Sequence, residues 1–158
     1  MAPEFKDKVL GLLELKSRIN ALKTDGKKIV FTNGCFDIIH VGHTRYLTMA
    51  KSLGDILIVA VNSDDSVSRL KPGRPIVSEY ERAEVLASLS MVDYVVIFNE
   101  DTPYETICEL CPDVLVKGGD WKKQDIVGAD IVPEVHSLPF VDGRSTTEII
   151  NKILRICS

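Results

Sequence analysis

The sequence predicts an α/β fold, a Rossmann-like doubly wound parallel sheet of about five strands. Short apolar runs typical of buried strands alternate with stretches of helical periodicity. The run over 56–61 is apolar throughout, as expected for a parallel strand covered on both faces. The segments richest in Gly, Asp, Asn and His, at 32–43, 62–65 and 117–121, each follow a predicted strand. Because such sheets bind ligands at the carboxyl ends of their strands, these three segments predict one shared site.

The strands are predicted from short runs of aliphatic and aromatic residues that are bounded by turn signals. Long connections between these runs leave room for crossover helices, which favours parallel pairing. We expect strands at 28–32, 56–61, 93–98, 114–116 and 134–138.

Helices are predicted where apolar residues recur every three or four positions. Leu12, Leu15, Ile19 and Leu22 give such a pattern near the N-terminus, and this helix could belong to the core or contact another copy of the chain. Two prolines and a glycine make 71–75 a loop. From periodicity and capping residues, we expect helices at about 8–23, 42–53, 67–70, 79–90, 103–110 and 146–156.

Length, charge and cysteine usage limit the possible classes of protein. The 158 residues suit a single domain, with 1–26 as an N-terminal helix and linker and 27–158 as the main domain. The net charge of −4 argues against a general binder of nucleic acid or anionic membrane. No apolar run approaches the roughly 20 residues that span a bilayer, and the N-terminus lacks the pattern of a signal peptide, so we expect a cytoplasmic protein. Cys108 and Cys111 have C-x-x-C spacing without a second pair, and we interpret them as ordinary thiols rather than a zinc site or redox pair.

Two of the three histidines, His40 and His43, lie at the junction between the first predicted strand and the helix after it. The start of a helix exposes unpaired backbone N–H groups and the positive end of the helix dipole, so it attracts anions. Histidines at this place therefore point to a phosphate site.

Several common motifs for phosphate or hydrolytic chemistry are absent from the sequence. There is no G-x-x-x-x-G-K-[ST] loop and no G-x-G-x-x-G fingerprint, which excludes a P-loop kinase and a Rossmann dehydrogenase. There is also no H-E-x-x-H and no G-x-S-x-G, which excludes a zincin metalloprotease and an α/β-hydrolase.

Two motifs resemble those of a known superfamily. Asn33-Gly34-x-Phe36-Asp37, followed by His40-x-Gly42-His43, resembles the signature of the cytidylyltransferase-like nucleotidyltransferases. A second hallmark, an I-S-T-T-like segment before the last helix, is similar to Arg144-Ser145-Thr146-Thr147-Glu148-Ile149. The resemblance covers residue 27 to the C-terminus, so it identifies 27–158 as a nucleotidyltransferase domain.

Within this superfamily, the sequence is most similar to the D-glycero-β-D-manno-heptose 1-phosphate adenylyltransferases. By the same resemblance, Phe140 stands where glycerol-phosphate cytidylyltransferases have an arginine, which counts against cytidylyl transfer. The blocks that carry the similarity are 31–37, 61–64, 74–75, 93–96, 113–120 and 138–140.

The resemblance implies a transfer of AMP from ATP to a sugar 1-phosphate, giving an ADP-sugar such as ADP-heptose and pyrophosphate. The nucleophile needs no strong base, because a phosphate monoester with a second pKa of about 6 is already ionised at neutral pH. Catalysis then consists of alignment and neutralisation of charge by protonated His, Lys, Arg, backbone N–H groups and the Mg²⁺ that accompanies ATP. The implied partners are ATP, the sugar 1-phosphate and a second copy of the chain in a homodimer, with no metal held by the protein alone.

The resemblance also assigns roles to individual residues. It makes His40, His43 and Lys71 catalytic. The residues assigned to nucleotide binding are Thr32, Asn33, Gly34, Phe36, His40, Gly42, His43, Lys117, Gly119, Asp120, Trp121, Ser145, Thr146 and Thr147. Those assigned to the sugar phosphate are Asp37, Asn62, Asp64, Arg74 and Arg82.

Structural roles compete with several of these assignments. His43 could be a helix cap, and Asp37 could equally order the turn or position a metal. Lys71, Arg74 and Arg82 could be solvated surface charges. His136, on the last predicted strand, is interpreted as a structural residue.

Two other functions remain open at the level of sequence. A glycerol-3-phosphate or related alcohol-phosphate cytidylyltransferase would carry the same two motifs. A nucleotide-binding module without catalytic activity would belong to a different class, although both histidines of the motif are present.

Overall fold

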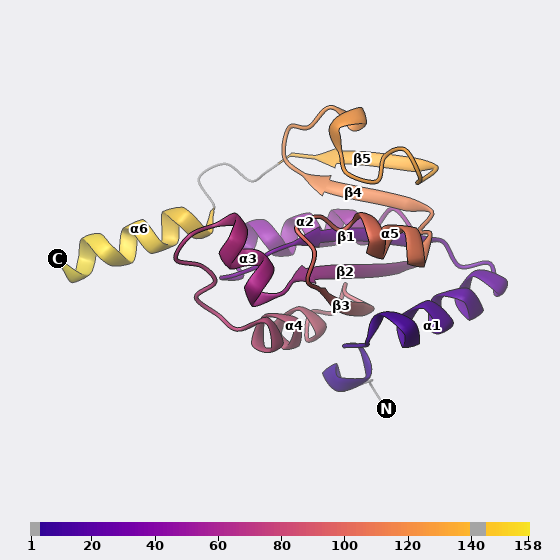
Figure 1. The fold of residues 1–158 in the computed structure, drawn as a ribbon, viewed down its shortest axis with the longest axis horizontal. Helices are drawn as coiled ribbons and strands as arrows, with labels where there is room; N and C mark the ends of the chain where they lie inside the picture. The colour runs from indigo at the N-terminus through magenta and orange to yellow at the C-terminus, as the bar shows by residue number, and fades with distance from the viewer. Residues whose placement is uncertain (1–3, 140–144) are drawn as a thin grey trace.

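The computed structural model describes residues 4–139 and 145–158, so Phe140 and Arg144 lie outside the described residues. Its centre is a five-stranded, all-parallel sheet with strand order β3-β2-β1-β4-β5 (Figure 1). The strands are β1 (Ile29–Gly34), β2 (Ile56–Asn62), β3 (Tyr94–Phe98), β4 (Val114–Gly118) and β5 (Glu134–Leu138). The predicted α/β fold is confirmed.

The strand order reverses once, between β1 and β4. From β1 the chain builds outward through β2 to β3, and it then returns to the other side of β1 to add β4 and β5. Such a reversal opens a crevice at the carboxyl ends of the two central strands, which is where doubly wound sheets bind their ligands.

Helices cover both faces of the sheet (Figure 1). On one face, Leu47 of α2 (Val41–Lys51) and Leu86 of α4 (Glu79–Ala87) are fully buried. On the other face, Leu15 of α1 (Leu12–Thr24) and Ile107 of α5 (Tyr104–Leu110) are fully buried. Each such side chain contributes about 1.5–3 kcal/mol of hydrophobic stabilisation relative to exposure. The N-terminal helix is therefore part of the core. The helices are α1 (Leu12–Thr24), α2 (Val41–Lys51), α3 (Asp64–Leu70), α4 (Glu79–Ala87), α5 (Tyr104–Leu110) and α6 (Thr146–Cys157), with short 3-10 turns η1 (Phe5–Asp7) and η2 (Lys123–Asp125).

Every predicted strand and helix is present, and the differences lie at their ends. The first helix begins at Leu12 rather than at residue 8, because the preceding residues pair with the edge strand β3: Leu10 N donates to Val95 O at 3.0 Å and Val95 N donates to Lys8 O at 2.9 Å. The third helix begins at Asp64 rather than at 67, because the Ser63 hydroxyl caps it.

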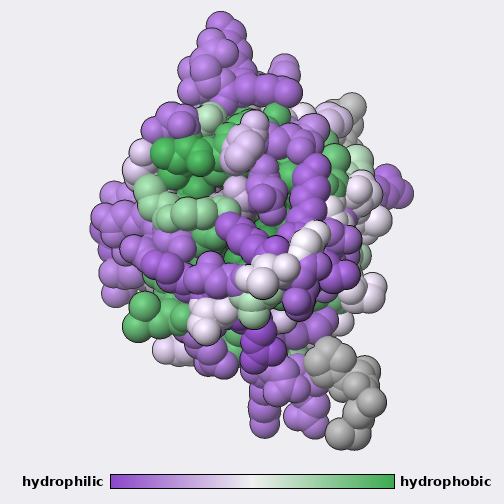
Figure 2. Space-filling model, turned by 90° about the vertical axis from the view of Figure 1, so that its right-hand side faces the viewer, coloured by the Kyte–Doolittle hydropathy of each residue, from purple (hydrophilic) through white to green (hydrophobic). Residues whose placement is uncertain are grey.

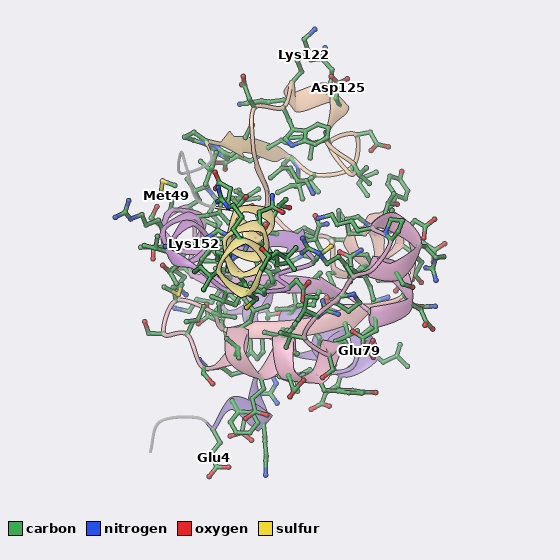
Figure 3. The ribbon with its side chains drawn as sticks, turned by 90° about the vertical axis from the view of Figure 1, so that its left-hand side faces the viewer. Glu4, Met49, Glu79, Lys122, Asp125 and Lys152 are labelled. Carbon is green, nitrogen blue, oxygen red and sulfur yellow. The ribbon has the colours of Figure 1, made fainter. Side chains whose placement is uncertain are left out.

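The last helix differs from the others in its packing. Figure 1 shows α6 leading away from the carboxyl ends of the strands, and Figure 3 shows it end-on with Lys152 on its outer part. Its residues 151–158 are all exposed, including Ile153, Leu154 and Ile156.

The opposite side of the molecule, in Figure 2, is mostly hydrophilic with separate hydrophobic groups. Among the described residues, no helix is long and apolar enough to cross a membrane.

Candidate active site

The residues that join β1 to α2, together with the first residues of α2, form the histidine turn (residues 35–43). Phe36 has a φ of +49°, a left-handed conformation that is uncommon for residues other than glycine and is concentrated at functional sites. Its ring folds back over Gly34, where an added Cβ would lie 2.9 Å from Phe36 Cε2. The same ring lies 5.3 Å from the ring of His43, centre to centre. This packing explains why a glycine and an aromatic residue are spaced two apart before the histidines.

His40 and His43 cap the start of α2 through one nitrogen each. Gly42 N donates to His40 Nδ1 at 3.1 Å, and His40 N donates to His43 Nδ1 at 3.3 Å. Since each Nδ1 accepts a hydrogen bond, the proton of each neutral imidazole is on Nε2. A cap and a ligand contact therefore do not exclude each other, because they use different nitrogens of the ring.

His43 is neutral at pH 7 in the ligand-free protein. Burial lowers its pKa to about 4, and the nearby charges of His40 and Lys71 act in the same direction. The protonated histidine expected from the sequence is thus not the resting state of His43. Neutral His43 still donates from Nε2–H, and bound phosphates would raise its pKa by favouring the charged form.

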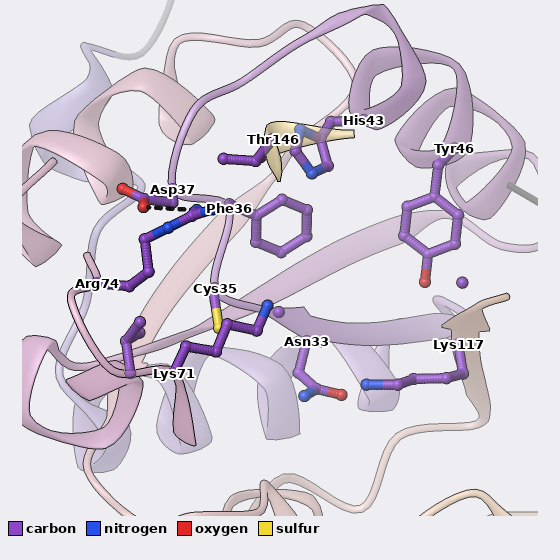
Figure 4. A pocket seen from close by; sticks show the side chains of 13 residues that line it. Asn33, Cys35, Phe36, Asp37, His43, Tyr46, Lys71, Arg74, Lys117 and Thr146 are labelled. Atoms are coloured by element: carbon purple, nitrogen blue, oxygen red, sulfur yellow. Dashed lines mark hydrogen bonds and ion pairs between the residues drawn. The ribbon is translucent and has the colours of Figure 1, made fainter. Parts of the chain in front are cut away.

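A cavity of about 160 Å³ opens beside the histidine turn at the carboxyl edge of the sheet (Figure 4). His43 lines it, whereas His40 stacks behind His43 with 3.9 Å between ring centres. The other residues that line this first cavity are Asn33, Gly34, Cys35, Phe36, Asp37, Tyr46, Val67, Lys71, Arg74, Lys117, Gly118 and Thr146.

A second cavity, of about 320 Å³, lies on the other side of the β1 end, toward the residues that precede α5 and toward η2. Trp121 and Asn62 line this cavity and do not line the first one. The residues that the two cavities share are Asn33, Gly34, Cys35, Lys71 and Lys117. Those that line only the second are Asn62, Leu70, Asp101, Thr102, Pro103, Trp121, Asp125, Ile126 and Val127.

Lys71 and Lys117 place two positive charges where the cavities meet. Lys117 is the residue before the last one of β4, and Lys71 follows α3. Burial lowers the pKa of the Lys117 ammonium, and the charge of Lys71 lowers it further. Within residues 4–139 and 145–158, neither ammonium has a carboxylate partner. Two ammonium groups that line both cavities without an ion pair favour an anion at this junction.

Four residues that were assigned to the sugar phosphate form ion pairs within the protein itself. Asp37 accepts from the backbone N–H groups of Ile76 and Val77 and pairs with Arg74. Arg82, which the sequence left open as a solvated charge, has a fully buried side chain and pairs with Asp64 at 2.8 Å. The solvated alternative for Arg82 is therefore wrong.

Other assigned residues are placed as follows. Thr32 is buried and bonds to the Tyr46 hydroxyl rather than lining a cavity, and Thr147 lies 3.5 Å from Arg74 at the start of α6. Trp121 is half-exposed, with its indole N–H donating to Gly118 O. The assigned residues that line neither cavity are Thr32, His40, Gly42, Asp64, Arg82, Gly119, Asp120, Ser145 and Thr147.

Sequence reasoning missed several residues that line the cavities. Tyr46 lies one helical turn after His43, so the periodicity of α2 could have placed it on the same face. Asp101 and Thr102 follow β3, and the rule that ligands gather at carboxyl ends applies to them as well. Cys108 and Cys111 are exposed thiols, and His136 bonds to Glu134.

Comparisons with known proteins show the family to which the chain belongs. The family model described as cytidylyltransferase-like matches residues 31–152. A Bifunctional protein HldE from a Nitratiruptor species is 61% identical over 133 residues, which are 84% of this chain and 29% of that protein. Another, from Geobacter metallireducens, is 56% identical over 94% of this chain and 31% of its own length. The chain therefore spans less than a third of these curated relatives.

Solved structures show the same fold. The lipopolysaccharide core biosynthesis protein from Thermoplasma volcanium has a TM-score of 0.64 at 32% identity, covering 74% of this chain and 100% of that one. A pantoate-beta-alanine ligase from Francisella tularensis has a TM-score of 0.58 at 18% identity, covering 95% of this chain and 78% of that one. The second likeness concerns the fold alone.

Proposed function

Because this chain belongs to the cytidylyltransferase-like family of nucleotidyltransferases, we propose that it transfers AMP from ATP to a sugar 1-phosphate. D-glycero-β-D-manno-heptose 1-phosphate is the proposed acceptor, and ADP-heptose and pyrophosphate are the products. The name of the Thermoplasma relative, a lipopolysaccharide core biosynthesis protein, supports a sugar acceptor of this kind.

The observation that carries this proposal is the meeting of two cavities at Lys71 and Lys117. A reaction that joins two phosphorylated molecules needs one compartment for each of them and positive charge where their phosphates meet. We place the phosphates of ATP in the first cavity, beside His43 and Thr146, and the sugar phosphate in the second, beside Asn62 and Trp121.

In the proposed step, a phosphate oxygen of the sugar phosphate forms a bond to the α-phosphorus of ATP. The bond from that phosphorus to the bridging oxygen breaks, and pyrophosphate leaves with the electron pair. His43 donates from Nε2–H to a phosphate oxygen, and Lys71 and Lys117 balance the charge of the two meeting phosphates. Because the nucleophile is already ionised, the protein contributes alignment and charge stabilisation.

We propose that Mg²⁺ enters with the phosphates of ATP. Mg²⁺ keeps several waters and is commonly held by substrate phosphates with one or two carboxylates. Asp37 does not suit such a role, since both of its oxygens already accept N–H groups of the protein. Mg²⁺ bound to ATP would neutralise charge on the departing pyrophosphate.

Release of pyrophosphate tests the proposal. The measurement compares ATP with CTP, GTP and UTP, each alone and with heptose 1-phosphate, glycerol 3-phosphate or glucose 1-phosphate. We expect release with ATP and heptose 1-phosphate and none with ATP alone. A preference for CTP with glycerol 3-phosphate would select the cytidylyltransferase instead. Binding of ATP without release from any acceptor would select a non-catalytic module.

We also propose that the chain is a cytoplasmic homodimer. The exposed apolar residues of α6, with Ile153 50% and Leu154 62% exposed, support a contact with a second copy. Light scattering during gel filtration should give twice the chain mass of 17.5 kDa, and Ile153→Glu should shift it toward the monomer. A monomer over the whole accessible concentration range would contradict the dimer.

A further inference from the structure

We propose that Asp37 and Arg82 are positioning residues that clamp the basic loop (residues 71–77) to the histidine turn and thereby hold Lys71 and Arg74 at the first cavity. The catalytic part of this inference rests on the proposed function. The clamp itself is a structural statement and can be tested without any activity.

The basic loop has little hydrophobic packing to hold it. Lys71, Pro72 and Gly73 are exposed, and Gly73 has a φ of +77°, which L side chains rarely adopt. Ile76, the first large apolar residue of the loop, is 61% exposed. Since burial of apolar surface is the main source of order in a loop, polar contacts must fix this one.

Asp37 supplies the first half of the clamp from the histidine turn. Its Oδ1 accepts from Ile76 N at 2.8 Å and from Val77 N at 2.9 Å, and its Oδ2 lies 3.3 Å from Arg74 Nη1. The carboxylate is 5% exposed. Charge-assisted hydrogen bonds of this kind are stronger than neutral ones, and burial strengthens them further.

Arg82 supplies the second half from α4. Its Nε donates to Val77 O at 2.9 Å, and its Nη1 donates to Cys35 O at 2.6 Å. Its Nη2 donates to Asp64 at the start of α3, the helix that ends just before Lys71. The backbone of Val77 is therefore held at two points, by Asp37 at its N–H and by Arg82 at its C=O. Asp37 belongs to the histidine turn, and Arg82 is bonded to that turn through Cys35 O.

The same contacts argue against a direct role of these two residues in binding. Arg82 lines neither cavity, and each of its three nitrogens already has an acceptor in the protein. Asp37 lines the first cavity, but both of its carboxylate oxygens already accept hydrogen bonds from the basic loop, and a carboxylate does not attract the phosphate of a ligand. Their contribution is to keep Lys71 and Arg74 in place.

Native-state hydrogen exchange tests the clamp without an activity assay. In Asp37→Asn, the amides of Ile76 and Val77 should exchange roughly tenfold faster, because they lose a charged acceptor. Asp93→Asn is the matched control: Asp93 accepts from Leu57 N at 2.7 Å and pairs with Lys51, but it lies at the amino ends of the strands. That variant should leave exchange at 76 and 77 unchanged. Unaltered protection of both amides in Asp37→Asn would overturn the clamp.

A double-mutant cycle tests whether Asp37 acts through the loop. Asp37→Asn should lower kcat about tenfold in the wild-type background and less than about threefold in a Lys71→Ala background, because residues that act through one another are not additive. KM for the sugar phosphate should change little. Additive losses, or a raised KM with unchanged kcat, would make Asp37 a substrate ligand and overturn its positioning role.

The variant Arg82→Lys tests the clamp independently, from the side of α4. A single ammonium cannot reach three acceptors in the geometry of a guanidinium, so this variant should show the same faster exchange at 76 and 77. Circular dichroism identifies a failure to fold, in which case the milder Asp37→Asn decides. If the wild type transfers no nucleotide at all, the proposed function fails while the exchange experiment still decides the clamp.

Discussion

The histidine turn and the basic loop face the same cavity but are held in different ways. The histidine turn is ordered by neighbours in the sequence: Phe36 packs on Gly34, and the two histidines cap their own helix. The basic loop is ordered by Asp37 and Arg82, which lie outside it. Asp37 belongs to the histidine turn, and Arg82 belongs to α4. The first is a rigid local motif, and the second is a segment positioned from a distance.

This difference indicates how the site divides its work. Groups that must keep a fixed orientation are on the rigid motif, and positive charges that must approach a bound anion are on the loop. Loops over a site are suited to closing on their ligand, provided that a few contacts fix their ends.

The largest expected effect belongs to the rigid motif. His43→Ala should lower kcat by about 10²–10³, the range observed when one preorganised donor is removed from a reacting centre. The dissociation constant of ATP should change less than about threefold, because the donor acts mainly in the transition state. Single-turnover rates and ATP titrations measure the two quantities, with His136→Ala as the control. Equal losses in both would mean that His43 only binds the nucleotide.

The two lysines at the junction of the cavities differ in how far they are buried. Lys117 is half-buried at the end of a central strand, whereas Lys71 is exposed on the loop. Lys117→Met should therefore lower kcat by about 10²-fold and Lys71→Met by about tenfold, since a partly buried charge stabilises a transition state more than a charge exposed to solvent does. Lys122→Met, an exposed neighbour outside both cavities, should have no effect. A larger loss for Lys71 would show that the loop, once closed, is the better ordered of the two.

Acid should weaken the fold through His43. Its pKa is lowered to about 4 in the folded protein, from 6.5. The unfolded chain therefore binds a proton below about pH 6.5 that the folded chain takes up only near pH 4, so stability falls as the pH drops through this window. The shift corresponds to at most about 3 kcal/mol. Because the ring is partly exposed, about 1–2 kcal/mol is expected.

Urea unfolding measures this dependence at a series of pH values from neutral to about 4.5. His43→Gln should have a flatter profile than the wild type, because glutamine does not titrate. His136→Gln should keep the wild-type profile. The same dependence of unfolding free energy on pH in the wild type and in His43→Gln would mean that folding does not lower the pKa of His43.

The sequence predicted the local parts of the molecule and missed the distant ones. The sequence predicted the class of sheet but not its strand order. The junction between β1 and α2 was placed correctly, because the contacts that cap α2 and pack Phe36 on Gly34 are local in the sequence. The roles of Asp37 and Arg82 could not be read from the sequence, since an aspartate and an arginine 45 positions apart carry no sign that both hold Val77. Their charges suggested that they bind a substrate, whereas in the structure both side chains are buried and bond to backbone groups. Trp121 was expected beside the nucleotide, but only the packing of residues 119–127 decides which cavity it lines.

The smallest expected effect concerns the support of the rigid motif. Tyr46 Oη donates to Val116 O at 3.1 Å and accepts from Thr32, so its hydroxyl links α2 to β4 and β1 inside the core. Burial raises the pKa of this phenol, which keeps it neutral. Tyr46→Phe should cost about 1–2 kcal/mol of unfolding free energy, because Val116 O loses a buried donor. Its kcat should stay within about threefold, since both hydrogen-bonding functions of the hydroxyl serve the protein. Thermal and urea unfolding, with the exposed Tyr80→Phe as control, measure the first quantity. A tenfold loss of kcat without loss of stability would instead place the Tyr46 hydroxyl among the groups that act on the phosphates, and the rigid motif would then extend one turn further along α2.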